Sequence, residues 1–266
     1  MAAQQVTVIQ VQGSEKKMKT TKESPRETYR GTAIITGVLF IVGTVAGILS
    51  VVFTGSILGD PNYLVKVSVN ANQIALGSLF VLIMGLALAM VPVVIFPILK
   101  KYNEVLALGY VVFRGALETV ACFVTAISWL LLVNLGQDYA SAGTPNAPYF
   151  LTLGNLFLKA ADIGATMGAI VFPLGAMMLY VVFYQSKLIP RWLSIWGLIG
   201  VTLHLLATGL GGLFGLTGSM STIQTVVALP IALQEIVMAV WLIVKGFDPS
   251  ALASGPAKTG LNQGNK

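Results

Sequence analysis

Residues 77–91 read Gly-Ser-Leu-Phe-Val-Leu-Ile-Met-Gly-Leu-Ala-Leu-Ala-Met-Val and carry no charged side chain. Apolar residues occur on all sides of this run. They do not alternate with polar residues over about ten positions, as the strands of a transmembrane β-barrel do. Backbone amides in hydrocarbon need partners within their own segment, so the run predicts a membrane-spanning helix.

Outward from this run, the chain contains five more apolar stretches of similar length. Each has about the 20 residues that a helix needs to cross a hydrocarbon core of about 30 Å. The sequence therefore predicts an all-α polytopic bundle of six transmembrane helices. These predicted spans lie near residues 31–54, 74–99, 105–133, 162–185, 192–215 and 223–245.

The composition agrees with a membrane protein. Of the 266 residues, 56% are hydrophobic and 10% are charged, and the mean hydropathy is +0.83. Soluble domains average roughly 45–50% apolar and about 25% charged residues. A soluble globule, a disordered chain and a collagen-like fibre are therefore excluded. The net charge of +6 comes from lysines and arginines at span ends and tails, so the expected partner is the lipid bilayer and not nucleic acid.

The segments outside the spans divide into tails and connections. We expect residues 1–30 and 248–266 to be disordered cytoplasmic tails around a six-helix transmembrane domain at 31–247. Two short interfacial helices are expected on the outer side. One follows Asp60-Pro61 and includes Tyr63, and the other covers residues 149–158.

The apolar block around the fourth span is longer than one crossing requires. As a single helix it would extend roughly 57 Å. We therefore expect the helix to break near Gly154 or Lys159, between the second interfacial helix and the span.

The distribution of lysine and arginine predicts the orientation. With the N-terminus inside, thirteen of the sixteen basic residues lie on the inner side, Lys66 and Lys159 lie on the outer side, and Arg114 lies within a span. This imbalance follows the positive-inside rule, so both termini are expected in the cytoplasm. An aromatic belt is expected at the inner boundary, formed by Tyr102, Tyr180, Tyr184 and Trp192.

Four ionisable residues lie inside the predicted spans: Arg114, Glu118, His204 and Glu235. Counting about 1.5 Å per residue from the span ends places all four about 15–20 Å from the inner boundary. A charge at this depth costs at least about 2.5–3.5 kcal/mol, so the groups should be paired. We expect Arg114 to bridge Glu118 and Glu235, with His204 nearby.

Helical spacing indicates which neighbours share this polar centre. Tyr110, Arg114 and Glu118 recur four residues apart and so lie on one helix face. His204 follows Gly197 and Gly200 in a stripe of small residues, which is where membrane helices approach closely. The candidate polar-core or ligand-binding residues are Tyr110, Arg114, Glu118, His204, Gln234 and Glu235.

Each candidate also has a structural interpretation. A buried charge cluster can serve only to fix helix packing, and a lone histidine in a small-residue stripe is more often a packing residue than a ligand. Cys122 is expected to be inert in apolar surroundings. No spacing motif supports a metal site or a haem, and we expect no catalytic residue, metal or cofactor.

Three parts of the chain, which together span about residues 30–247, resemble a known family. The first runs from Arg30-Gly31-Thr32 to Ser50, with Asp60-Pro61-Asn62-Tyr63-Leu64 after it. The second joins residues 107–114 to Glu118. The third runs from Leu188 through Pro190-Arg191-Trp192 to Gly200, and ends with Gln234-Glu235 and residues 240–247. These blocks resemble a bacterial integral-membrane family known as domain of unknown function 4386.

The resemblance implies a multi-pass protein of the bacterial cytoplasmic (inner) membrane that has no assigned activity. It supplies no catalytic residues. Three of the candidate residues, Arg114, Glu118 and Glu235, fall within the blocks that carry the resemblance.

Three classes of function follow from these observations. The first is a transporter, channel or proton-linked carrier of a small molecule or ion, with the charged cluster as its polar centre. The second is a structural or regulatory membrane protein in which the cluster only fixes packing. The third, an intramembrane enzyme or cofactor binder, is disfavoured because catalytic sequence motifs are absent. The glycine stripes are compatible with packing within one chain or in a homo-oligomer.

The predicted orientation can be checked by cysteine labelling. A cysteine introduced into the 137–160 loop is expected to react with a membrane-impermeant maleimide from outside the cell, because few basic residues occur there. Labelling of this loop only from the cytoplasmic side would reverse the orientation.

Overall fold

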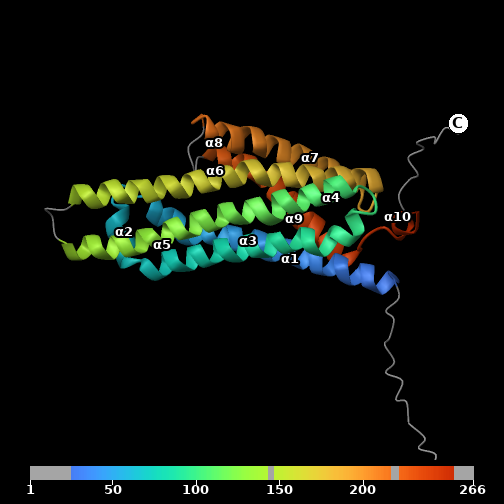
Figure 1. Cartoon of the computed structure of the whole chain (residues 1–266), viewed down its shortest axis with the longest axis horizontal. Coiled ribbons are helices and arrows are strands. Elements are labelled where there is room, and N and C mark those ends of the chain that lie inside the picture. The colour runs from blue at the N-terminus through green and yellow to red at the C-terminus, as the bar shows by residue number, and fades with distance from the viewer. Residues whose placement is uncertain (1–24, 143–146, 217–221, 255–266) are drawn as a thin grey trace, which may run out of the picture.

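The computed structural model describes residues 25–142, 147–216 and 222–254 (Figure 1). Within these ranges the chain forms helices and no strand, and six helices are long and apolar enough to cross a membrane. The predicted all-α fold with six spans is therefore confirmed. The helices, in chain order, are α1 (Pro25–Leu58), α2 (Tyr63–Val69), α3 (Ala71–Leu99), α4 (Glu104–Tyr110), η1 (Val111–Leu117), α5 (Glu118–Ala142), α6 (Ala147–Ser186), α7 (Arg191–His204), η3 (Leu205–Leu210), α8 (Gly211–Leu213), α9 (Thr222–Val244) and α10 (Pro249–Ser254).

The six spans form a closed ring. The third span is continuous through α4, η1 and α5, and the fifth through α7, η3 and α8. Each span packs chiefly against two neighbours, in the order α1, α3, α5, α6, α7, α9 and back to α1. The third span therefore lies across the ring from the sixth, α9.

Glycines allow α1 to approach both of its neighbours. A Cβ atom built on Gly43 would lie 2.5 Å from the Leu88 side chain of α3. One built on Gly37 would lie 2.6 Å from the Ala239 carbonyl oxygen of α9. Both distances are too short for a real methyl group, so the backbone of α1 packs directly against these helices.

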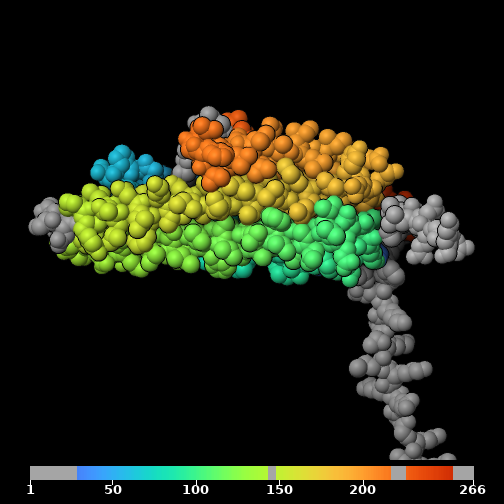
Figure 2. Space-filling model, turned by 45° about the horizontal axis from the view of Figure 1, so that its top comes forward, coloured from blue at the N-terminus to red at the C-terminus, as the bar shows by residue number. Residues whose placement is uncertain are grey.

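Helices α5 and α6 extend beyond the other spans at the end of the bundle that carries α2 (Figures 1 and 2). There α2 packs against α5, and its Tyr63, Leu64 and Val67 are buried. The Tyr63 hydroxyl donates a hydrogen bond to Asn155 Oδ1 of α6 at 2.9 Å. Helix α2 is thus the first of the two predicted interfacial helices.

The predicted break near Gly154 or Lys159 is wrong, and the second predicted interfacial helix is the first part of α6. This helix is continuous over 40 residues. At Gly154, a Cβ atom would lie 2.4 Å from the Tyr63 hydroxyl oxygen, so the missing side chain makes room for the α2 aromatic ring. The surplus length is accommodated by an extension that packs on α5 and α2, and no break is needed.

Helices extend into both of the segments that were predicted as tails. Helix α1 begins at Pro25, six residues before the predicted start, and α10 is a helix inside the segment predicted as the C-terminal tail. Arg30 donates to the carbonyl oxygens of Ile243 at 2.6 Å and Val244 at 3.2 Å, and so caps the end of α9. The remainder of both predicted tails lies outside the described residues.

The contact between α1 and α9 can be tested with two glycines of α1. We expect Gly37→Ala to lower the free energy of unfolding by about 1–3 kcal/mol, because the new methyl group meets the backbone of α9. In the control Gly31→Ala, the methyl group meets nothing within 4 Å, so stability should stay the same or rise by up to about 1 kcal/mol. Equilibrium unfolding in mixed micelles measures both. Equal effects of the two substitutions would contradict the close contact.

Candidate functional site

Arg114 is bonded to two glutamates in the middle of the ring. Its Nη1 donates to both carboxylate oxygens of Glu118 at 3.0 Å, and its Nη2 donates to Glu235 Oε1, also at 3.0 Å. The predicted bridge is therefore confirmed. We call Arg114, Glu118 and Glu235 the charged triad. Because Arg114 lies on η1 and Glu235 on α9, the triad joins spans from opposite sides of the ring.

The triad is buried, but its members are not buried equally. Only 2% of the Arg114 side chain is exposed, against 11% for Glu118 and 10% for Glu235. About a tenth of each glutamate side chain is thus exposed, whereas the arginine side chain is almost completely enclosed. One cation faces two carboxylates, so the triad has a net charge of −1 when both are ionised and is neutral when one holds a proton.

Phe172 of α6 connects the triad to His204. The Arg114 guanidinium carbon lies 4.3 Å from the centroid of the Phe172 ring, which is close enough for a cation–π interaction. His204 makes an edge contact with the same ring, with 5.5 Å between centroids. His204 is therefore near the triad, as predicted, but it contacts the phenyl ring and not a glutamate.

Two short π-helical segments pack against α6, the helix that carries Phe172. η1 contains Arg114, η3 begins directly after His204, and both pack against α6. In η1, the Glu118 N–H donates to the Phe113 carbonyl oxygen, five residues earlier instead of four. Segments of this kind are rare and occur frequently at functional sites. Their position therefore agrees with a specialised role for this layer.

The π-helical turn of η3 changes which residue of the fifth span meets α6. A Cβ atom on Gly209 would lie 2.8 Å from the Ala169 carbonyl oxygen. That carbonyl has no helical donor, because Pro173 has no N–H. The extra residue in the turn brings Gly209 to this position, and the hydroxyl of its neighbour Thr208 is also buried.

Gln234 does not join the triad. It is fully buried, its Oε1 accepts a 2.6 Å hydrogen bond from the Tyr180 hydroxyl, and its Nε2 donates to the Leu193 carbonyl oxygen of α7. Tyr180 was expected in an aromatic belt at the membrane boundary, and this is wrong because its side chain is fully buried. Trp192, at 52% exposed, fits that belt.

Further polar atoms lie buried in this region. His204 Nδ1 and Thr208 Oγ1 have no hydrogen-bond partner among the residues that the structure describes. Tyr110 is 1% exposed and within electrostatic range of all three residues of the triad. Unpaired polar atoms in hydrocarbon are costly, so His204 Nδ1 and Thr208 Oγ1 are available to bind water or a ligand.

Sequence reasoning missed Phe172 and assigned Tyr180 to the membrane boundary. The only local signal for Phe172 is the proline that follows it, since a proline inside a span frees a carbonyl group. Among the described residues, no group of three His, Cys, Asp or Glu side chains is placed to hold a metal ion. Cys122 is buried, with a free thiol.

The unity of the triad can be tested by removing its cation. We expect Arg114→Met to lower the free energy of unfolding by about 3–5 kcal/mol, because both carboxylates lose their partner. The triple variant Arg114→Met, Glu118→Gln, Glu235→Gln should recover most of this loss, since it buries no charge. The control Lys100→Met, at an exposed position, should change stability by at most about 0.5 kcal/mol. If the Arg114→Met variant is as stable as the wild type, the three residues do not act together.

Comparison with known proteins identifies the family. The model of the family described as Domain of unknown function (DUF4386) matches residues 35–246, a range that contains all six candidate residues and Phe172. Neither the curated proteins nor the solved structures that were compared include a match. The match covers most of the chain and agrees with the resemblance seen in its sequence. This integral membrane protein therefore belongs to the family described as Domain of unknown function (DUF4386).

Proposed function

We propose that this protein is a proton-linked carrier of a small solute or ion, and that the charged triad is its proton-binding centre. The observation that carries the proposal is that two carboxylates share one guanidinium in the middle of the six-helix ring. Uptake of one proton by either glutamate takes the triad from a charge of −1 to neutral. Carboxylates in spans are typical of proton relays in pumps and transporters.

Three features around the triad support this proposal. About a tenth of each glutamate side chain is exposed, whereas the arginine side chain is almost fully buried. The Tyr110 hydroxyl is close enough to interact with all three residues of the triad electrostatically. Two π-helical segments lie at the same level and pack against α6. Together they place a titratable group, a further polar atom and irregular backbone in one layer.

A packing role is the second candidate, and one observation favours it. The third and sixth spans are not neighbours in the ring, so the 3.0 Å bond between Arg114 and Glu235 ties its opposite sides together. In that case the triad would stabilise the bundle and bind no ligand. The two candidates differ in whether the carboxylates exchange a proton.

We also propose that the end of the bundle that carries Arg30, Lys100, Lys101, Lys187, Arg191 and Lys245, here called the basic end, faces the cytoplasm. The opposite end carries Lys66 and Lys159, together with Asp60, Asp138 and Asp162. This asymmetry is the positive-inside pattern. With the resemblance seen in the sequence, it supports placement in a bacterial cytoplasmic membrane.

Proton exchange can be measured without knowing the solute. For the wild type in lipid bilayers, we expect pH-difference infrared spectra to contain a carboxylic-acid band that disappears in Glu118→Gln or Glu235→Gln. The matched control Glu104→Gln removes an exposed carboxylate at the basic end and should leave this band unchanged.

Transport is then measured in proteoliposomes that enclose a pH-sensitive dye, with a panel of small cations and polar solutes. Solute-driven proton flux is expected in the wild type, and it should be abolished in Glu235→Gln at a similar melting temperature. If no band depends on Glu118 or Glu235, and Glu235→Gln only lowers the melting temperature, the packing role is correct and the carrier proposal is wrong.

A further inference from the structure

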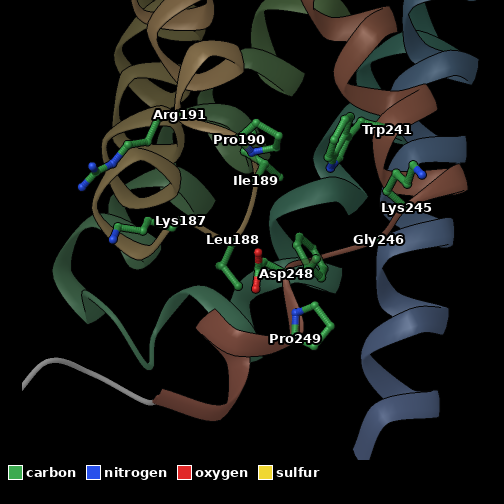
Figure 3. A pocket seen from close by; sticks show the side chains of 11 residues that line it. Lys187, Leu188, Ile189, Pro190, Arg191, Trp241, Lys245, Gly246, Asp248 and Pro249 are labelled. Carbon is green, nitrogen blue, oxygen red and sulfur yellow. The ribbon is translucent and has the colours of Figure 1, made fainter.

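A cavity of about 390 Å³ lies at the basic end, away from the charged triad. It is formed where α6 ends, α7 begins and α9 turns into α10, as the close view in Figure 3 shows. Its lining includes Lys187, Leu188, Arg191, Lys245, Phe247 and Asp248. These helices are membrane spans, so the cavity lies at the level where a span meets the headgroup region.

Three cations border this cavity. Lys187 and Arg191 lie on one side and Lys245 on the other, with Leu188, Asp248 and Pro249 between them (Figure 3). Within the described part of the chain, no ion pair joins any of these cations to a carboxylate. Arg191 lies over the Tyr184 ring, with 5.1 Å from its guanidinium carbon to the ring centroid. No carboxylate of the described residues therefore neutralises these three charges, whose side-chain ends point away from the middle of the cavity in Figure 3.

Asp248, the one carboxylate among the described residues that line the cavity, already accepts hydrogen bonds from α10. Asp248 Oδ1 accepts hydrogen bonds from the backbone N–H of Ser250 at 2.7 Å and of Ala251 at 3.3 Å. A side-chain hydrogen bond with Ser250, together with these backbone bonds, lowers the pKa of Asp248 below its ordinary value of 3.8, so it stays ionised at neutral pH. Three cations and one carboxylate leave the lining with a net charge of +2.

The rest of the lining is mostly apolar. Leu188, Ile189 and Phe247 are at most 5% exposed, so their side chains pack beneath the surface of the cavity. Next to the cavity, Trp192 is 52% exposed and stacks on Trp196, as expected of aromatic residues at a membrane interface. A ligand with a charged head and an apolar body fits this combination better than a small hydrophilic ion does.

A second cavity, of about 550 Å³, adjoins the first across residues 245–249. The two cavities share Lys245, Gly246, Phe247 and Pro249, and the second adds Tyr29 and Arg30. The Arg30 guanidinium binds the last carbonyls of α9 and so brings a fixed positive charge to this surface. The two spaces together are large enough for an extended headgroup.

We propose that the first cavity binds the phosphate group of an anionic phospholipid, held by Lys187, Arg191 and Lys245. Clusters of Lys and Arg next to transmembrane helices attract anionic headgroups, and basic pockets between spans bind them specifically. Long basic side chains on both sides of the cavity can turn towards one phosphate while the acyl chains follow the apolar outer surface. This site is independent of the triad, so the proposal does not depend on the carrier function.

The proposal can be tested with the full-length protein in detergent, titrated with phosphatidylglycerol or phosphatidylcholine and followed by native mass spectrometry. The wild type should bind phosphatidylglycerol more tightly than phosphatidylcholine. The variant Lys187→Gln/Lys245→Gln should bind phosphatidylglycerol about tenfold or more weakly. The matched control Lys100→Gln/Lys101→Gln removes the same number of charges from the basic end, but outside the first cavity. This control should bind phosphatidylglycerol as tightly as the wild type does.

Competition with inorganic phosphate distinguishes a site for a lipid headgroup from a site for a phosphate ion in solution. Displacement of phosphatidylglycerol only at high phosphate concentration supports a lipid site. Phosphate binding that depends on Lys187 and Lys245, without any lipid preference, would mean that the ligand comes from water and that the lipid assignment is wrong. Equal weakening in the two double variants would show diffuse attraction to the basic end and would overturn the site. Melting temperatures in phosphatidylcholine check that the variants are folded.

Discussion

The Arg114 guanidinium lies between the carboxylates of Glu118 and Glu235, in the middle of a ring of six helices. A charge in hydrocarbon is costly unless it is paired, so this contact sets conditions for the helices around it. η1 and α9 must place these groups at the same depth and turn them towards each other across the ring. The helices on either side must then pack so closely that lipid cannot reach the pair.

The backbone around the triad departs from regular α-helix. Two π-helical segments and Pro173 lie in the layer of Arg114, Phe172 and His204. A Cβ atom on Gly175 would lie 3.0 Å from the backbone nitrogen of Arg114, so α6 contacts η1 directly beside the arginine. In the described part of the chain, His204 Nδ1 and Thr208 Oγ1 lie buried near these features without a hydrogen-bond partner. Close packing and unused hydrogen-bonding capacity therefore occur in one place.

The two ends of the bundle differ in charge and construction. At the basic end, cations line a cavity where three spans end or begin, and Arg30 binds the last carbonyls of α9. At the opposite end, α5 and α6 extend past the other spans and hold α2. There Lys66 forms a 2.6 Å ion pair with Asp60, and this hydrogen-bonded contact lowers the pKa of Asp60. A surface with free cations is suited to anionic headgroups, whereas one with paired charges is not.

The sequence by itself determined the six spans, because a long apolar segment can satisfy its backbone in lipid only as a helix. It also determined the pairing of Arg114 with Glu118 and Glu235, since charges in spans are few and residue counts gave their depths. Hydropathy contained no information on whether α6 would break near Gly154, because the first part of the helix is held by tertiary contacts such as that of Tyr63 with Gly154. Only the tertiary structure decided that Gln234 binds Tyr180 and that Phe172 covers the guanidinium. The π-helical turns and the contacts of neighbouring helices fix how each helix is rotated, and side-chain partners follow from that rotation.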